Sequence, residues 1–127
     1  MTETALPPTG PAVHLELRDA LARHSGRDGE HSVPLFRHGS LMVKLYAPRV
    51  TDPQTPHARD EIYVVGQGRG VFFDGETRRP FEPGTFLFVK AGRPHRFEDF
   101  TNDFAVWVFF YGPEGGEVDG DDEAEPA

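Results

Sequence analysis

The sequence predicts an all-β protein, an antiparallel barrel or sandwich preceded by one short helix. Short segments rich in β-branched and aromatic residues recur along the chain, and such residues favour strands. Turn residues separate these segments at short intervals, with no helical pattern between them. A length of 127 residues fits a single domain around one hydrophobic core.

The expected helix lies near the N-terminus, at residues 13–24, after a flexible stretch over residues 1–12. Four apolar residues and one histidine recur there at the 3.6-residue period of an amphipathic helix. These residues are Val13, Leu17, Ala20, Leu21 and His24. Gly26 is expected to stop the helix, because glycine commonly ends helices.

The strands follow in series. They are expected at residues 33–36, 41–47, 61–65, 71–73, 77–81, 85–89, 95–98 and 104–111. The Asp74-Gly75 dipeptide suits a type I′ hairpin turn. Residues 104–111 are apolar on both faces, so one face should meet the core and the other the N-terminal helix or a second subunit.

Two stretches contain side chains that could bind a metal ion. His57 and Glu61 stand at the start of an apolar strand, and in an extended chain they share a face with Arg59, Tyr63 and Val65. His95 follows the turn at residues 91–94. Two neutral imidazoles and a carboxylate on rigid strands would form a facial triad, a ligand set associated with non-haem Fe(II) that also suits Zn, Mn or Ni.

Residues 40–111 resemble the cupins, small jelly-roll β-barrels that hold a divalent metal. The first cupin motif is Gly, five residues, His-x-His, three or four residues, Glu, six residues, Gly, and here Glu61 and Gly68 are in register. The second motif is Gly, five residues, Pro-x-Gly, two residues, His, three residues, Asn. It matches at Gly84, Gly92 and His95, with Lys90 in place of Pro and Asp99 in place of Asn.

The first motif lacks one imidazole and its leading glycine. Counting back from Glu61 makes His57 the second His, with Thr55 at the place of the first; counting forward makes His57 the first, with Arg59 replacing the second. The resemblance implies an antiparallel jelly roll over residues 13–113, with one divalent ion (Fe, Zn, Mn or Ni) at His57, Glu61 and His95.

The resemblance implies two functions. The protein is either a metal-dependent enzyme of the dioxygenase, isomerase or lyase type, acting on a small polar molecule inside the barrel, or a non-catalytic module that holds a ligand or a metal. A homodimer is expected, because many cupins pair through sheet faces and exchanged N-terminal segments.

An ordinary structural use of the same residues stays open. In that interpretation His57 caps the turn after Pro56, Glu61 pairs with Arg59 or Arg96, and His95 only hydrogen-bonds the loop.

Further pocket residues are also predicted. Arg59 could enter the barrel mouth, where it would lower metal affinity by repulsion and by competing for the carboxylate of Glu61, or would clamp a substrate carboxylate. Alternatively, it turns to solvent. Gln54 and Asp60 are candidate fourth ligands, although Asp60 has the wrong strand parity. The aromatic residues Tyr63, Phe97 and Trp107 are candidates both for the core and for the pocket wall.

The net charge of -8 is concentrated in the C-terminal segment. Residues 114–127 contain seven acids and no base, so we expect a disordered acidic tail. The rest of the chain is close to neutral, which argues against nucleic-acid binding. The sequence has no membrane-spanning or signal segment and no cysteine, so a cytoplasmic protein without thiolate chemistry is expected.

Overall fold

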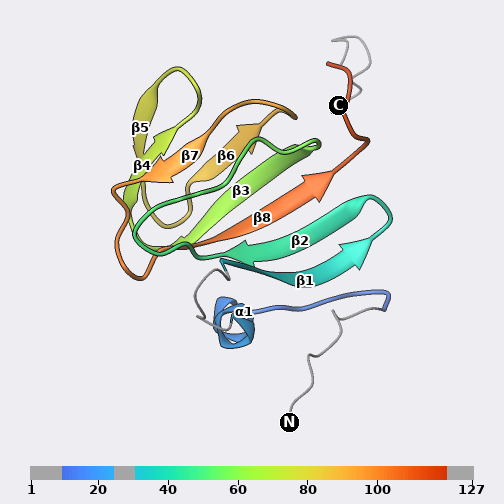
Figure 1. The fold of residues 1–127 in the computed structure, drawn as a ribbon. Helices are drawn as coiled ribbons and strands as arrows, with labels where there is room; N and C mark the ends of the chain where they lie inside the picture. Colours follow the sequence, from blue (N-terminus) through green and yellow to red (C-terminus); the bar gives the residue numbers. More distant parts are fainter. Residues whose placement is uncertain (1–9, 25–30, 120–127) are drawn as a thin grey trace.

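The computed structural model describes residues 10–24 and 31–119, which form two antiparallel sheets and one short helix (Figure 1). Helix α1 spans Leu17–Arg23. The strands are β1 (Ser32–His38), β2 (Leu41–Tyr46), β3 (Asp60–Gln67), β4 (Gly70–Phe73), β5 (Arg78–Phe81), β6 (Phe86–Val89), β7 (Arg96–Glu98) and β8 (Ala105–Tyr111). The strand predictions are confirmed, with ends shifted by no more than two residues.

The strands form a sandwich of the jelly-roll type. The larger sheet has the order β1-β2-β8-β3-β6, and the smaller has the order β5-β4-β7. From β3 onward the chain passes back and forth between the sheets, and no ladder among the described strands joins the two sheets. Phe97 lies in the core between them, with its ring centroid 4.9 Å from that of Tyr63 and 5.0 Å from that of Phe72.

Strand β3 positions the candidate site because it lies in the larger sheet between β8 and β6. Its alternation buries Glu61, Tyr63 and Val65, as the period of two predicts for residues facing the core. Gly68 ends this strand with a φ of 92°, and a Cβ there would lie 2.5 Å from Cα of Phe104. Only glycine fits both the backbone conformation and this close approach.

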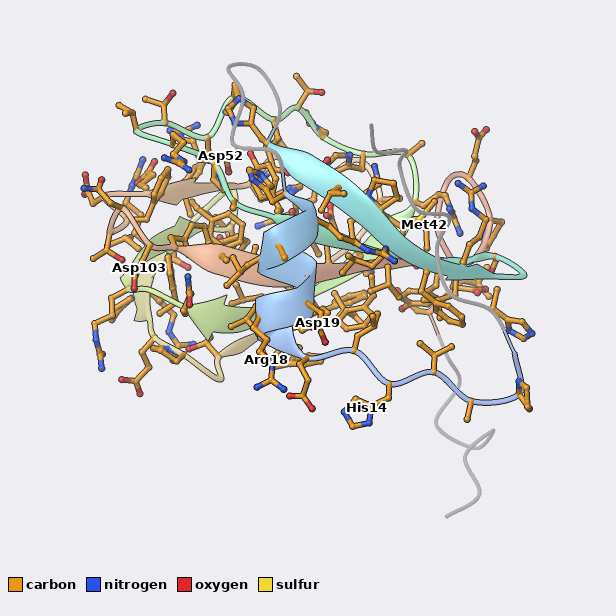
Figure 2. All side chains as sticks on the ribbon, turned by 90° about the horizontal axis from the view of Figure 1, so that it is seen from below. His14, Arg18, Asp19, Met42, Asp52 and Asp103 are labelled. Atoms are coloured by element: carbon orange, nitrogen blue, oxygen red, sulfur yellow. The ribbon has the colours of Figure 1, made fainter. Side chains whose placement is uncertain are left out.

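The outer face of the larger sheet is covered by the N-terminal segment. Helix α1 lies across this face, on the side away from the smaller sheet (Figures 1 and 2). The cluster beneath it contains Leu17, Ala20 and Leu21 from the helix with Leu35 and Leu45 from the sheet. The N-terminal helix, one of the two covers considered for this face of β8, lies against it, and a second subunit stays a prediction.

The helix is shorter than the predicted span of 13–24. Residues 13–16 precede it without regular secondary structure, and Glu16 caps it through a reciprocal pair of contacts with Asp19. His24 is already extended, so the helix ends before Gly26, which lies outside the described residues. No helix in the described part of the chain combines the length and the apolar character needed to cross a bilayer.

The predicted type I′ turn at Asp74-Gly75 is wrong. Four residues connect β4 to β5, and of Asp74 and Gly75 only the glycine has a positive φ. The carboxylate of Asp74 accepts hydrogen bonds from the amides of Glu76 and Thr77, which closes the longer turn.

The prediction of a disordered tail from residue 114 needs correction for residues 114–119. The amide of Gly115 donates to the carbonyl of Ala58 at 2.7 Å, and the amide of Glu117 donates to the carboxylate of Asp60 at 2.8 Å. Composition alone concealed this docking, because it is made by backbone amides and not by apolar side chains. The flexible stretch predicted at residues 1–12 and the end of the tail lie largely outside the described residues, at 1–9 and 120–127.

Candidate metal centre

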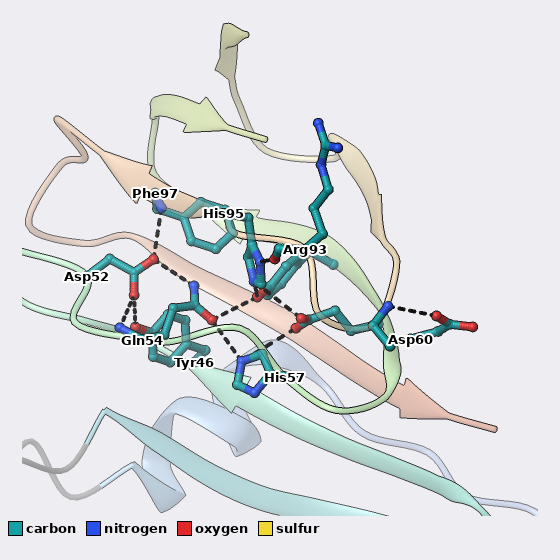
Figure 3. A network of polar contacts seen from close by, with 11 residues as sticks. Tyr46, Asp52, Gln54, His57, Asp60, Arg93, His95 and Phe97 are labelled. Carbon is teal, nitrogen blue, oxygen red and sulfur yellow. Dashed lines mark hydrogen bonds and ion pairs between the residues drawn. The ribbon is translucent and has the colours of Figure 1, made fainter. Parts of the chain in front are cut away.

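The three predicted ligands come together beside the start of β3, and Figure 3 labels His57 and His95. Nε2 of His95 lies 3.2 Å from Oε1 of Glu61, and Nε2 of His57 lies 3.9 Å from Oε2. One ligand atom from each residue lies within 4.8 Å of the other two. Because first-row metal ions bind such atoms at about 2 Å, two ligands of one ion lie up to about 4 Å apart. The two measured distances fall within this span.

Glu61 is the buried anion of the group. Its side chain is 1 % exposed, and its Oε2 atom has no hydrogen-bond partner among the described residues. An unpaired carboxylate oxygen in a buried position is costly unless a cation or a donor reaches it. This atom faces His57, on the side where a metal ion would complete the group.

His95 is held in the tautomer that metal binding requires. Its Nδ1 atom lies 2.8 Å from the carbonyl oxygen of Arg93, which can only accept, so Nδ1 carries a proton. In the neutral ring Nε2 then has a free lone pair directed at Glu61 and at the hydroxyl of Tyr63, which is 3.0 Å away. A hydrogen bond to the far nitrogen is the usual way to orient a metal-binding imidazole.

The two imidazoles have pKa values shifted in opposite directions. Burial lowers the pKa of His57, and the nearby Glu61 only partly opposes this effect. Burial also acts to lower the pKa of His95, but hydrogen bonds to Glu61 and to the Arg93 carbonyl reverse the balance and leave that pKa raised. The neutral, metal-binding form is therefore favoured at His57, whereas at His95 a metal ion competes with a proton.

A hydrogen-bond network around Asp52 supports the group from one side (Figure 3). Asp52 accepts from the hydroxyl of Tyr46, from the amide of Phe97 at 2.8 Å and from the side chain of Gln54 at 2.6 Å. The last bond turns the amide oxygen of Gln54 toward His57, whose Nε2 lies 3.0 Å away. The network thus places one more oxygen beside the predicted ligands.

A pocket of about 220 Å³ opens onto His57 and Glu61. Tyr46, Val108 and Phe110 give it apolar walls, and Gln54 and Tyr63 add polar atoms near the ligands. A small cavity of this mixed character is typical of a site for a small molecule.

Only some of the additional predicted residues line the pocket. Gln54 and Tyr63 line the pocket, whereas Phe97 lies behind Tyr63 in the core. Trp107 belongs to the cluster on the outer face of the larger sheet, because its strand parity is opposite to that of Val108. Phe97 and Trp107 are therefore removed from the predicted pocket.

Arg59 also points elsewhere. Its Nε atom donates to the carbonyl of Gly112 at 3.0 Å, so it neither clamps a ligand in the pocket nor competes for Glu61. Asp60 accepts from the amides of Ala91 and Glu117, as its unfavourable parity for a ligand suggested. Both residues tie loops together instead of facing the ligands.

Neither proposed register for the missing imidazole describes the loop. Thr55 is exposed, and Arg59 is turned to Gly112. Gln54 is the residue that lies beside His57. The competing interpretation also differs from the structure, because the recorded ion pairs of Glu61 are with the two histidines, while Arg96 pairs with Glu98.

Three residues near the site were not predicted from the sequence to belong to it. Lys44 and Tyr46 face the pocket from β2, and the alternation of this strand could have indicated that they share a face. Asp52 lies in an irregular loop, where no periodicity identifies buried positions.

Comparisons with known proteins agree with this architecture. Residues 42–111 match the family model described as the cupin domain. A protein of Streptomyces coelicolor, described as uncharacterized, is 35% identical over 95 residues, which cover 73% of this chain and 90% of that protein.

Solved structures show the same fold. A cupin-2 domain protein of Shewanella frigidimarina has a TM-score of 0.61 at 12% identity, covering 77% of this chain and 94% of that one. A cupin 2 conserved barrel protein of Salinispora arenicola has a TM-score of 0.60 at 18% identity, covering 82% and 91%. The TT1209 protein of Thermus thermophilus has a TM-score of 0.57 at 25% identity, covering 73% and 95%. Because the cupin domain model matches more than half of its residues, this chain belongs to the cupin family.

Proposed function

We propose that this protein binds one divalent metal ion through His57, Glu61 and His95 and holds a small polar molecule beside it in the pocket. The observation that carries the proposal is the buried carboxylate of Glu61, which lies between two imidazoles and whose Oε2 atom has no hydrogen-bond partner among the described residues. Burying a carboxylate in this way is unfavourable without a cation, and a metal ion would supply it.

The donor set restricts the metal. Nitrogen and oxygen ligands without thiolates suit Fe(II), Zn, Mn or Ni. Three protein ligands leave coordination positions for water or for a bound molecule, and the pocket provides room on the side of His57. A bound metal ion would supply Lewis acidity, or oxygen activation if it is iron.

The surrounding residues orient ligands and protons. The Arg93 carbonyl fixes the ring of His95, and Asp52 fixes the amide of Gln54. Burial, reinforced by the charge of Glu61, raises the pKa of Tyr63 well above its usual range, so the phenol stays protonated. A protonated phenol beside the ligands can donate a hydrogen bond to an oxygen of a bound molecule.

This phenol favours the enzymatic form of the proposal, a reaction on a small polar substrate of the dioxygenase, isomerase or lyase kind. A second candidate is a module that holds its ligand without turnover. It is favoured by Gln54, which already satisfies both His57 and Tyr63 in the metal-free network. A cytoplasmic location and a homodimer remain predictions alongside both candidates.

Elemental analysis of the purified protein tests the metal centre. We expect about one divalent ion per chain in the wild type and almost none in His95→Ala, with His38→Ala, outside the site, as the matched control. Equal, near-zero metal in wild type and His95→Ala after reconstitution would refute the centre. A screen for oxygen uptake and for turnover of small acids, thiols and phenols then separates the enzyme from the holding module.

A further inference from the structure

The pocket contains a cation for which the described part of the chain provides no ion-pair partner. Lys44 extends from β2 into the pocket wall, on the same face as Tyr46, and is partly buried. Its recorded contact is with the ring of Phe110, whose centroid lies 5.8 Å from Nζ. Among the described residues no carboxylate forms an ion pair with it. Because Lys44 lies against an aromatic ring and lines the pocket, an anion that enters the pocket would supply its ammonium group with an ion-pair partner.

Lys44 and Glu61 are the charged side chains that line this pocket, apart from the titratable histidines. Lys44, His57 and Glu61 line the same pocket, so the cation and two of the predicted ligands share one compartment. Asp52 lies behind the wall, where donors from Tyr46, Gln54 and Phe97 already offset its charge. Arg59 is hydrogen-bonded to the carbonyl of Gly112 and does not bring a second cation into the pocket.

The charge balance depends on the metal. Without it, the negative charge of Glu61 is offset by Lys44 and, when His95 is doubly protonated, by that ring as well. With a divalent ion held by one carboxylate and two neutral imidazoles, the centre carries a net positive charge, and Lys44 adds another. The pocket should then prefer an anion, while Tyr46, Val108 and Phe110 favour an apolar body on the same molecule.

We propose that the ligand of this pocket is a small organic carboxylate with an apolar body, whose carboxylate pairs with Lys44 while the molecule lies beside the metal. This inference rests on the proposed metal centre and adds the chemical class of the ligand. Lys44 acts as a specificity residue, recognising the anion as a point charge and not through a two-pronged guanidinium contact.

The test compares acids with their neutral isosteres on the zinc-loaded protein. Benzoate and isobutyrate are titrated against benzamide and isobutyramide by calorimetry. The proteins are wild type, Lys44→Met, Lys44→Arg and Lys90→Met. Lys90 is the other lysine of the chain; it is exposed and paired with Asp119, so it provides a matched control.

We expect at least one acid to bind the wild type and Lys90→Met about tenfold or more tightly than its amide, the gain typical of a hydrogen bond to a charged group. Lys44→Met should remove this preference, and Lys44→Arg should keep most of it. Zinc affinity, measured separately, should stay equal or rise in Lys44→Met, because a nearby positive charge has been removed.

The two proposals fail in different ways. If zinc binds normally, three results would each overturn the carboxylate assignment and leave the metal centre standing. They are equal affinity for acid and amide, no binding of either acid, and no effect of Lys44→Met on the preference. Absence of zinc binding would overturn the metal centre. In that case the titrations are repeated without metal. Acid binding that depends on Lys44 would support the anion site alone. Absence of such acid binding would overturn the anion site as well.

Discussion

Nε2 of His95 lies 3.2 Å from Oε1 of Glu61, and the other oxygen of the same carboxylate has no hydrogen-bond partner in the described part of the chain. The buried carboxylate therefore lowers the stability of the folded protein when no metal is bound. We expect Glu61→Gln to raise the stability of the metal-free protein by about 1 kcal/mol, because it removes a buried charge that is only partly paired. The same variant should lose the rise in melting temperature that metal gives the wild type. Thermal unfolding with and without zinc checks both effects, and a lower melting temperature for the metal-free variant would contradict this account.

Metal binding should depend on pH through His95. Its pKa in the folded, metal-free protein lies above the ordinary value of 6.5, so the ring keeps a proton on Nε2 between that value and the raised pKa. A raised pKa stabilises the metal-free fold fully below the ordinary pKa, and this contribution is lost as the pH rises through the folded pKa. Metal affinity should increase over the same window, with about one proton released per ion. Calorimetry in two buffers of different ionisation enthalpy measures the release, and binding without release at pH 6.5 would argue against His95 as a ligand.

Gln54 is the position at which the missing imidazole can be restored. Its amide oxygen lies 3.0 Å from His57 and 3.1 Å from the hydroxyl of Tyr63. We expect Gln54→His to tighten zinc binding about tenfold, because an imidazole is a better ligand than an amide oxygen. Thr55→His is the control, since residue 55 is exposed and should change little. Competition against a chromophoric chelator gives the affinities. If Thr55→His is the tighter variant, the loop takes a different path in solution.

The C-terminal segment should contribute to stability up to residue 119. Deleting residues 113–127 removes the donors from Gly115 and Glu117 and leaves Asp60 bonded to Ala91 alone. We expect a loss of about 1–3 kcal/mol, a fall of several degrees in melting temperature. Deleting only residues 120–127, a stretch rich in acids, should have almost no effect. Equal melting temperatures for the two truncations would show that the docking is energetically unimportant.

The homodimer remains a prediction, and the β6 edge of the larger sheet, where Phe86 and Phe88 stay exposed, offers a place for it. Phe86 and Phe88 on the edge strand β6 are 63% and 48% exposed. Large exposed aromatic side chains on a sheet edge are unfavourable in a monomer and typical of contact surfaces. We expect light scattering to show a dimer that Phe86→Ser combined with Phe88→Ser dissociates. A wild type that stays monomeric at high concentration would contradict the prediction.

The fold was largely predictable because its determinants are local. Turn residues such as Gly68 and Gly75 separate the strands, and alternation along β3 correctly placed Glu61 and Tyr63 on one face. The grouping of the ligands was implied by the family resemblance, since spacing alone cannot bring His95 to Glu61.

What could not be predicted depends on contacts between distant segments. Asp52 becomes part of the site through the amide of Phe97, and the C-terminal segment docks on Asp60. The direction of Arg59 depends on the carbonyl of Gly112. In each case a polar group of one loop meets the backbone of a remote one, and such pairings leave no periodic signal in the sequence.

The hydrogen bond from the amide of Phe97 to Asp52 makes one backbone proton a reporter of the rim of the site. This amide belongs to a strand, yet its acceptor is a side chain on the loop that also carries Gln54 and His57. The rate of deuterium uptake at this amide therefore reports how often the loop moves away and breaks the hydrogen bond to Asp52, independently of the opening of the sheet. Slower uptake at Phe97 on adding a ligand, with unchanged uptake at Val106 in the centre of β8, would show that the occupied pocket holds the loop closed.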